Sequence, residues 1–221
     1  MKFVFYEQAG EGSFELKDEL FKYLFRTRRH KEGELLFFRN PSEPSRLYSY
    51  KVASISSRQA LLELVRSETL EVVASRSLHL LWCIIDPKEI ERVFPTLCEM
   101  GVSKISFIYC ERSQRSYKLD MPRLRRLEIS AMQQCGRSSF MELEVLGSLD
   151  EAFGLYDEVV AFDFGGESAS DLRDLKRVLV GCEGGFSGSE RELFSKIVSF
   201  DTPLILRSQS AVLAVASKVL L

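Results

Sequence analysis

Two segments near the end of the chain carry residues that could bind a small molecule through main-chain groups. Gly181–Glu190 has three glycines within its first five residues, and Pro203–Ala211 follows after a short interval. Glycine lets a backbone approach another group closely and adopts positive φ without steric cost. The first segment therefore suits recognition by N–H and C=O groups, although an ordinary turn between a strand and a helix has the same composition.

Spacing excludes the best-known alternatives for such a loop. No Lys-Ser/Thr pair follows the last glycine, as a Walker loop requires, and the dinucleotide pattern Gly-x-Gly-x-x-Gly is absent. Only His30 and His79 could serve as imidazole groups, and neither belongs to a Ser–His or metal-binding pattern, so we expect no hydrolase chemistry and no metal. His79 lies in an apolar strand pattern, which predicts a buried side chain with satisfied hydrogen bonds.

The residues around the glycines predict a strand, a tight loop and a helix. The apolar run Val178–Val180 precedes the loop, and Ser187 with Glu190 forms the pattern of a capping box. Leu193, Phe194 and Ile197 would then give the helix an apolar face.

The rest of the C-terminal part alternates in the same way, which favours a parallel α/β sheet. The last helix is apolar on most sides, so we expect it in a core or an interface. Strands are predicted over 78–85, 102–109, 141–145, 158–164, 177–181 and 199–206, and helices over 87–100, 123–135 and 211–221.

The N-terminal part instead predicts a small β-barrel with one helix. Strands are expected over 1–6, 34–38 and 48–55, and a helix over 18–26. Residues 1–67 hold 12 Lys and Arg against 9 Asp and Glu, whereas residues 68–221 hold 18 against 23. The excess is concentrated in a basic cluster that suits either a solvated face or contacts to phosphates. The cluster consists of Lys22, Arg26, Arg28, Arg29 and Lys31.

Composition places the chain among ordinary soluble proteins. It has 221 residues, a formal net charge of −2 and 45% hydrophobic residues. The five cysteines include no C-x-x-C pair, so reduced thiols are expected rather than a disulfide framework or a zinc site. No apolar run is long enough to span a bilayer, and we expect a cytoplasmic protein.

Five short blocks, in order along residues 80–215, resemble those of one known family. Gly181–Gly185 resembles its GPEGG loop, and Leu206–Ala211 its LRTETA segment. Glu99–Val102 resembles ELGV, Glu111–Ser113 resembles SERS, and Gln133–Arg137 resembles EQCGR. The family is the RsmE family of the SPOUT superfamily, whose members methylate N3 of a uridine in 16S ribosomal RNA.

The resemblance implies a fold and partners. Residues 75–221 would form a SPOUT α/β domain with a deep trefoil knot, and residues 1–67 a PUA-like RNA-binding β-barrel. The implied cofactor is S-adenosyl-L-methionine and the implied substrate is 16S rRNA of the small ribosomal subunit. The family builds its active site across a two-fold interface, so a homodimer is expected.

The resemblance also implies functional residues. Catalytic roles fall to Arg207, Glu183 and Arg112, because a guanidinium would stabilise the uridine anion and a carboxylate could take a proton. RNA contacts are expected from Arg26, Arg28, Arg29, Arg112 and Arg137. Cofactor contacts are expected from Phe162, Gly181, Cys182, Glu183, Gly184, Gly185, Leu204, Ile205, Leu206, Arg207 and Ser208.

Two departures from the family pattern keep alternatives open. Cys182 stands where the family has proline, and Gln209 stands where it has glutamate. Because Gln209 cannot act as a carboxylate base, the chain could be an RNA-binding protein of the same fold without catalysis. The looser match of the N-terminal part also allows a methyltransferase that acts on another RNA.

Overall fold

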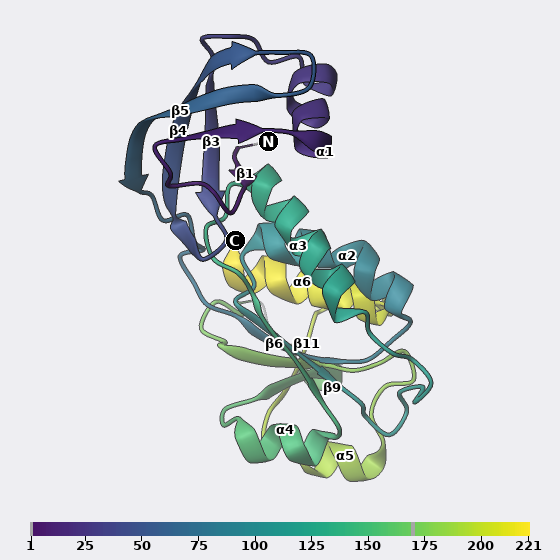
Figure 1. Ribbon diagram of the computed structural model, residues 1–221. Coiled ribbons are helices and arrows are strands. Elements are labelled where there is room, and N and C mark those ends of the chain that lie inside the picture. Colours follow the sequence, from purple (N-terminus) through teal and green to yellow (C-terminus); the bar gives the residue numbers. More distant parts are fainter. Residues whose placement is uncertain (1, 169–170) are drawn as a thin grey trace. The chain divides into compact units, whose positions relative to one another are not determined.

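The computed structural model describes residues 2–168 and 171–221, which divide into two compact units (Figure 1). Unit 1 comprises residues 1–73 together with 132–139. Unit 2 comprises residues 74–131 and 140–221. Among the helices of the described ranges, none is both long and apolar enough to cross a membrane.

Unit 1 is built on a five-stranded sheet with the order β1-β3-β4-β5-β2. All neighbouring strands are antiparallel except β1 and β3. A short α-helix and a following π-helix connect β2 to β3. The elements are β1 (Val4–Phe5), β2 (Ser13–Leu16), α1 (Asp18–Phe21), η1 (Lys22–Thr27), β3 (Leu35–Asn40), β4 (Glu43–Ile55) and β5 (Ala60–Thr69).

Aromatic side chains form the core of unit 1. The rings of Phe14 and Phe38 lie 5.5 Å apart, and Tyr50 packs against both. The Tyr50 hydroxyl donates to the carbonyl of Glu11 and accepts from the N–H of Gly10, so its polar end is satisfied inside the core. Sequence patterns predicted the helix and three strands but missed β2 and β5.

Unit 2 contains a six-stranded sheet in which every pairing is parallel, as predicted. Its order is β11-β9-β10-β6-β7-β8. The strands are β6 (His79–Cys83), β7 (Lys104–Ile108), β8 (Glu142–Leu146), β9 (Val160–Ser168), β10 (Arg177–Val180) and β11 (Ile197–Ser199).

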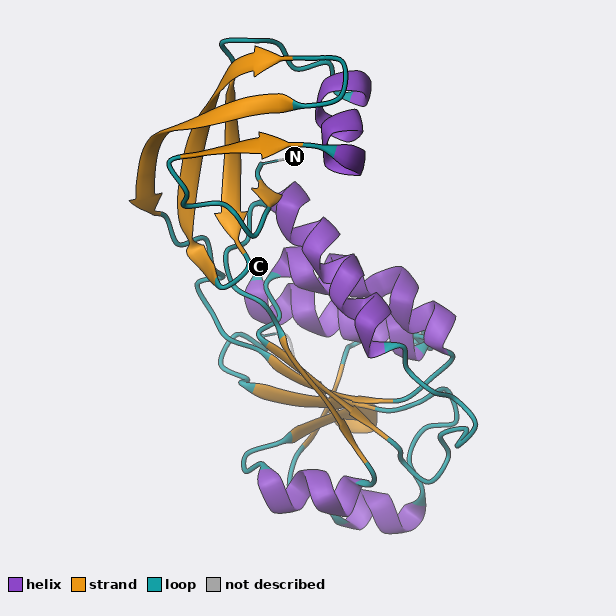
Figure 2. Ribbon diagram, viewed as in Figure 1, coloured by secondary structure: helices purple, strands orange, loops and turns teal. Residues whose placement is uncertain are grey.

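Helices cover both faces of this sheet (Figure 2). One face carries α2 (Pro87–Met100), α3 (Met121–Cys135) and α6 (Ser208–Leu220), and the other carries α4 (Leu149–Leu155) and α5 (Gly188–Glu192) (Figure 1). The α6 helix packs against α2 and buries most of its apolar residues, as its composition predicted. The α3 helix belongs to unit 2 as far as Ala131.

Both ends of α2 are set by residues at or next to its termini. Asp86 caps the first turn by accepting from the N–H of Lys88, and Pro87 occupies the first helical position, where no N–H is needed. Gly101 ends the helix with φ of 98°. A Cβ atom at this position would lie 2.4 Å from Cβ of Ala74, so both backbone conformation and packing require glycine.

The predictions around Ser187 and residue 199 were partly wrong. The capping box of Ser187 and Glu190 is present, but α5 ends at Glu192, and Ile197 starts β11 instead of extending the helix. The predicted strand 199–206 is a loop beyond Ser199. Its apolar residues resemble a buried strand, but Pro203 has no N–H for a ladder, and Leu204 and Ile205 are 73% and 78% exposed.

His79 is buried in β6, which confirms the sequence prediction. The Ser106 hydroxyl donates its proton to Glu144, so its oxygen can only accept from His79. The Nε2 atom of His79 lies 2.6 Å from the Ser106 oxygen and is therefore the N–H donor of a neutral imidazole. Tyr156 donates to the same carboxylate and accepts from Lys104. Burial foremost, and then the charge of Lys104, lowers the pKa of His79 from 6.5 to about 4.

This shift predicts a pH-dependent stability. The unfolded chain binds a proton on His79 below pH 6.5 whereas the folded chain does not, so stability is fully present above pH 6.5 and falls between pH 6.5 and about 4. The loss from this residue is at most about 3 kcal/mol. Chemical denaturation at several pH values should show that His79→Gln flattens the dependence in this window, and an unchanged slope would contradict the assignment.

Candidate functional site

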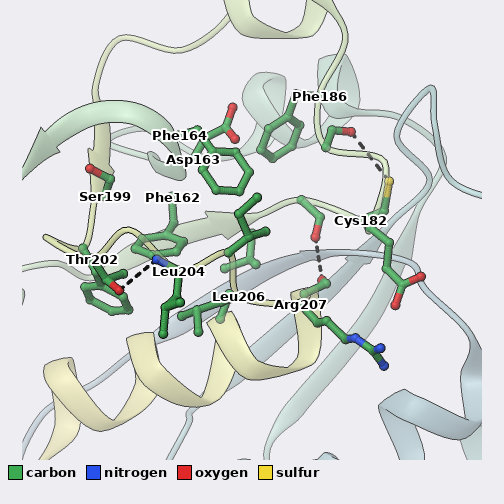
Figure 3. Close-up of a pocket in the computed structure, with 18 residues that line it drawn as sticks. Phe162, Asp163, Phe164, Cys182, Phe186, Ser199, Thr202, Leu204, Leu206 and Arg207 are labelled. Atoms are coloured by element: carbon green, nitrogen blue, oxygen red, sulfur yellow. Dashed lines mark hydrogen bonds between the residues drawn. The ribbon is translucent and has the colours of Figure 1, made fainter.

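A cavity of about 480 Å³ opens at the carboxyl ends of β10 and β11 and beside the middle of β9 (Figure 3). The glycine loop after β10 forms one wall, and the loop after β11 together with the start of α6 forms another. Of the predicted cofactor residues, Gly184 alone is not in the lining. The predicted residues that line the cavity are Phe162, Gly181, Cys182, Glu183, Gly185, Leu204, Ile205, Leu206, Arg207 and Ser208.

Sequence reasoning missed several lining residues. Phe200 packs on Phe162 with a centroid distance of 4.6 Å, and Phe186 lies on the side of the glycine loop. Asp163 is a buried acid within the apolar first half of β9, and its carboxylate pairs with Arg191 at 2.6 Å. That isolated charge in an apolar run was a signal that pattern reading did not use. The cavity thus combines aromatic walls with a buried carboxylate held by an ion pair.

Each glycine position of the loop has its own structural constraint. Gly185 has φ of 67°, which other residues rarely adopt. Gly181 lies against the Phe186 ring, where a Cβ atom would be 3.1 Å from the nearest ring carbon. Gly184 has no positive φ, and its constraint is the side chain of Arg112, 3.2 Å from the position of a Cβ atom. Gly184 therefore shapes the loop from its outer side.

A chain of hydrogen bonds joins the two walls of the cavity. The indole N–H of Trp82, fully buried in β6, donates to the Ser208 hydroxyl at 2.9 Å. Ser208 in turn donates to the carbonyl of Gly181 at 2.5 Å. The start of α6 is thereby connected to the start of the glycine loop through one buried side chain.

Glu190 braces the same loop from its other end. One carboxylate oxygen accepts from the N–H of Ser187, and the other accepts from the N–H of Glu111 at 2.7 Å. Arg112 then donates to the carbonyl of Gly184 at 2.7 Å. The segment 111–113 is therefore a support for the glycine loop, and the guanidinium of Arg112 has a structural partner in this state.

Arg207 and Glu183 are the charged candidates that line the cavity with exposed side chains. Arg207 is the N-cap residue of α6, and its guanidinium extends away from the apolar side chains of the cavity (Figure 3). No hydrogen bond of the Arg207 side chain occurs within the described ranges. Both groups are thus open to a substrate that approaches the cavity mouth.

Gln209 does not face the cavity. It is buried in α6, and its amide nitrogen donates to Glu89 of α2 at 3.0 Å. The position at which the RsmE-like pattern has glutamate therefore points into the helix packing. A carboxylate there would lie beside Glu89, so glutamine suits this chain's own interior.

The predicted RNA-contacting arginines of unit 1 differ in exposure. Arg26, Arg28 and Arg29 are exposed around the end of η1, and Arg29 has φ of 62°. Arg26 donates to the carbonyl of Ser57, and Arg28 donates to the hydroxyl of Tyr23. Arg137 is only 7% exposed and donates to the carbonyl of Ser139, so its placement favours a structural role over a phosphate contact.

The cysteines are free thiols in the structure. Cys110 and Cys182 approach closely, with their Sγ atoms 3.5 Å apart behind the glycine loop. Within residues 2–168 and 171–221, no group of three or more His, Cys, Asp or Glu side chains is arranged to hold a metal ion.

Comparisons with known proteins give the family. Residues 73–220 match the model of the RNA methyltransferase domain. The chain is 40% identical to the ribosomal RNA small subunit methyltransferase E of Helicobacter pylori, over 98% of both chains. This chain belongs to the ribosomal RNA small subunit methyltransferase E family.

Solved structures share the fold of this chain. The ribosomal RNA small subunit methyltransferase E from Neisseria gonorrhoeae, bound to S-adenosyl methionine, has a TM-score of 0.77 at 18% identity and covers 98% of this chain. A methyltransferase from Legionella pneumophila in complex with the same cofactor has a TM-score of 0.77 at 22% identity over 98% of this chain. The matched regions cover 95% of the Neisseria gonorrhoeae chain and 96% of the Legionella pneumophila chain.

The hydrogen-bond chain through Ser208 gives a prediction for the stability of the protein. Ser208→Ala should leave the Trp82 N–H and the Gly181 carbonyl without their partner, and should lower the free energy of unfolding by about 1–3 kcal/mol. Ser208→Thr keeps the hydroxyl and is the matched control. Urea denaturation measures both, and equal stability of Ser208→Ala and wild type would contradict the role of this bridge.

Proposed function

We propose that this chain transfers a methyl group from S-adenosylmethionine to N3 of a uridine in 16S rRNA of the small ribosomal subunit. The observation that carries the proposal is the cavity between the glycine loop and residues 204–208, in a chain that belongs to the methyltransferase E family. All of the predicted cofactor residues except Gly184 line this cavity, and they come from three separate segments of the chain.

The residues of the cavity fit the cofactor. A volume of about 480 Å³ is in the range of small-molecule sites, which are mostly apolar with a few fixed polar groups. Phe162, Phe186 and Leu206 offer surfaces for an adenine and a methionine chain. The main chain of Gly181–Gly185 and Leu204–Ser208 would bind the adenosine part, and Asp163 places a negative charge that suits a sulfonium or amino group.

The chain's own residues have two tasks in this reaction. When bound, S-adenosylmethionine supplies a methyl group already activated on a sulfonium. Arg207, at the mouth of the cavity, would stabilise the uridine base as its N3 proton is lost. Glu183 is the exposed carboxylate on the glycine loop that could accept this proton. Arg112 holds the loop on which Glu183 lies, so we assign it a positioning role.

The alternative of a catalytically inactive RNA-binding protein rested on Gln209. Because Gln209 bonds to Glu89 and does not line the cavity, the difference from the family pattern leaves the proposed catalytic groups untouched. A methyltransferase for another RNA is separated from the proposal by mapping modified nucleotides in a strain that lacks the gene. Loss of a methyl group outside the small-subunit rRNA would favour that alternative.

We propose further that unit 2 is a SPOUT domain with a trefoil knot and that unit 1 is a PUA-like domain for RNA. The cavity itself lies between the loop 181–185 and the segment 200–207, which is where a threaded C-terminal segment would shape a site. A homodimer is also part of the proposal. Leu204 and Ile205 support it, because these highly exposed apolar side chains beside the cavity would be covered by a second copy.

Arg207→Ala should lower the rate of methyl transfer by about 100-fold, as expected when one group that stabilises an anion is lost. Cofactor affinity should stay within about twofold, because the guanidinium acts on the acceptor base. Raising the pH should restore part of the rate by deprotonating the uridine. Radiolabelled methyl transfer to small ribosomal subunits measures the rate, and calorimetry measures the affinity.

A wild-type rate in Arg207→Ala would contradict the catalytic assignment. Methyl groups found on carbon or on a ribose oxygen would contradict the proposed reaction itself. Arg191→Ala is a useful comparison, because it removes the cation that pairs with Asp163 on the cofactor side. The carboxylate is then no longer neutralised, so the dissociation constant of the positively charged cofactor should fall.

The basic cluster of unit 1 gives a separate prediction. Changing Arg26, Arg28 and Arg29 to Ala should weaken RNA binding and reduce the slope of log affinity against log salt by about 2 to 3, one unit for each lost phosphate contact. The matched control replaces Lys51, Arg58 and Arg66, which are also exposed cations of unit 1. If both triple variants weakened RNA binding equally, the effect would come from the overall charge of unit 1 and the cluster would not be a specific RNA contact.

A further inference from the structure

A second cavity, of about 660 Å³, opens at the amino ends of the parallel strands of unit 2. Its lining includes the first residues of four strands, namely His79 of β6, Lys104 of β7, Glu142 of β8 and Arg177 of β10. The cofactor cavity lies at the carboxyl ends of the sheet, so the parallel strands separate the two sites. No role in the proposed methyl transfer involves this second cavity.

The lining of the second cavity is strongly basic. Among its residues Leu175 is the one aliphatic side chain, and hydroxyl groups come from Ser77, Ser103 and Tyr156. Two carboxylates face five cations, although the whole chain has a formal net charge of −2. The carboxylates are Glu142 and Asp174, and the cations are Arg76, Lys104, Arg173, Lys176 and Arg177.

The cations divide into a supporting and an available group. Lys104 donates to Tyr156 at 2.8 Å and lies 3.4 Å from Glu144, and Arg177 donates to the carbonyl of Asp157. Arg173 pairs with Asp171. Within the described ranges, the side chains of Arg76 and Lys176 make no hydrogen bond or ion pair. Both are exposed at the cavity and are available to an incoming anion, and Arg76 also acts through its charge on Asp171.

His79 reports the sign of the local field at the floor of the cavity. Burial is the main cause of its low pKa, and the charges of Lys104 and Arg177 lower the pKa further, against the opposing effect of Glu144. At this ring the two cations together outweigh the effect of Glu144, although Lys104 also pairs with Glu142 and Glu144. An anion in the cavity would be attracted by these groups and by the hydroxyls around them.

We propose that the second cavity binds phosphate groups and that its occupant is the phosphodiester backbone of the RNA substrate. Pockets for small molecules are mostly apolar, whereas contacts to a nucleic-acid backbone come from Arg, Lys and hydroxyl side chains, as found here. The choice of RNA rests on the proposed function. The phosphate chemistry rests on the lining alone.

This position has a consequence for the substrate. Strands of four to five residues are roughly 15 Å long, so the two cavities are separated by at least the length of such a strand. Helices cover both faces of the sheet, so an RNA that occupies both cavities must pass around one of these helical layers. The second cavity therefore favours a folded RNA that surrounds unit 2 over an isolated oligonucleotide.

The test replaces Arg76 and Lys176 with Ala and measures binding to unmethylated small ribosomal subunits over a range of salt concentrations. The double variant should bind about tenfold more weakly at low salt, and its slope of log affinity against log salt should fall by about 2. Its affinity for S-adenosylmethionine should be unchanged. A short RNA that carries the target uridine should bind equally to variant and wild type.

The control replaces Lys88 and Arg126, exposed cations of α2 and α3, and changes the net charge by the same amount. Equal loss in control and variant would overturn the proposal. A calorimetric titration with inorganic phosphate tests a free anion: saturable binding lost in the variant, with subunit binding unchanged, would overturn the RNA occupant. Failure of the wild-type protein to methylate subunits would contradict the proposed function. The binding comparison would still show whether the second cavity contacts RNA phosphates.

Discussion

The buried hydroxyl of Ser208 is the interaction on which the candidate site depends. It accepts from Trp82 in the centre of the sheet and donates to the carbonyl of Gly181, so it connects β6, the glycine loop and α6. Both partners are buried polar groups that would be costly to leave unpaired. The loops on either side of the cavity are therefore held in register by one short side chain whose size allows close packing.

A second set of contacts makes the glycine loop a rigid part of the site. Glu190 satisfies N–H groups of Ser187 and Glu111, and Arg112 binds the carbonyl of Gly184. Main-chain recognition needs such rigidity, because N–H and C=O groups select a ligand only when their directions are fixed. The charged residues around the loop thus divide into those that support it and those, Arg207 and Glu183, that face the cavity mouth.

Charge is distributed in a way that suits a large polyanionic partner. The chain is slightly acidic as a whole, yet exposed arginines gather at the end of η1 and cations line the second cavity of unit 2. On an acidic protein, separate basic sites attract RNA weakly when only one of them is engaged, because the affinity for RNA rises with the number of phosphates contacted at the same time. Recognition would then require an RNA whose shape presents phosphates to several sites together.

The sequence by itself determined the local structure and the family. Helix α2, the capping box at Ser187 and the buried strand around His79 follow from nearest neighbours, and the glycine loop with Leu206–Ala211 identified the methyltransferase E pattern. Only the tertiary structure decided that 200–207 is a loop, that Gln209 faces α2, and that Arg137 is buried. An apolar run does not reveal whether it packs in a sheet or lines a cavity, because that depends on which distant segments meet it.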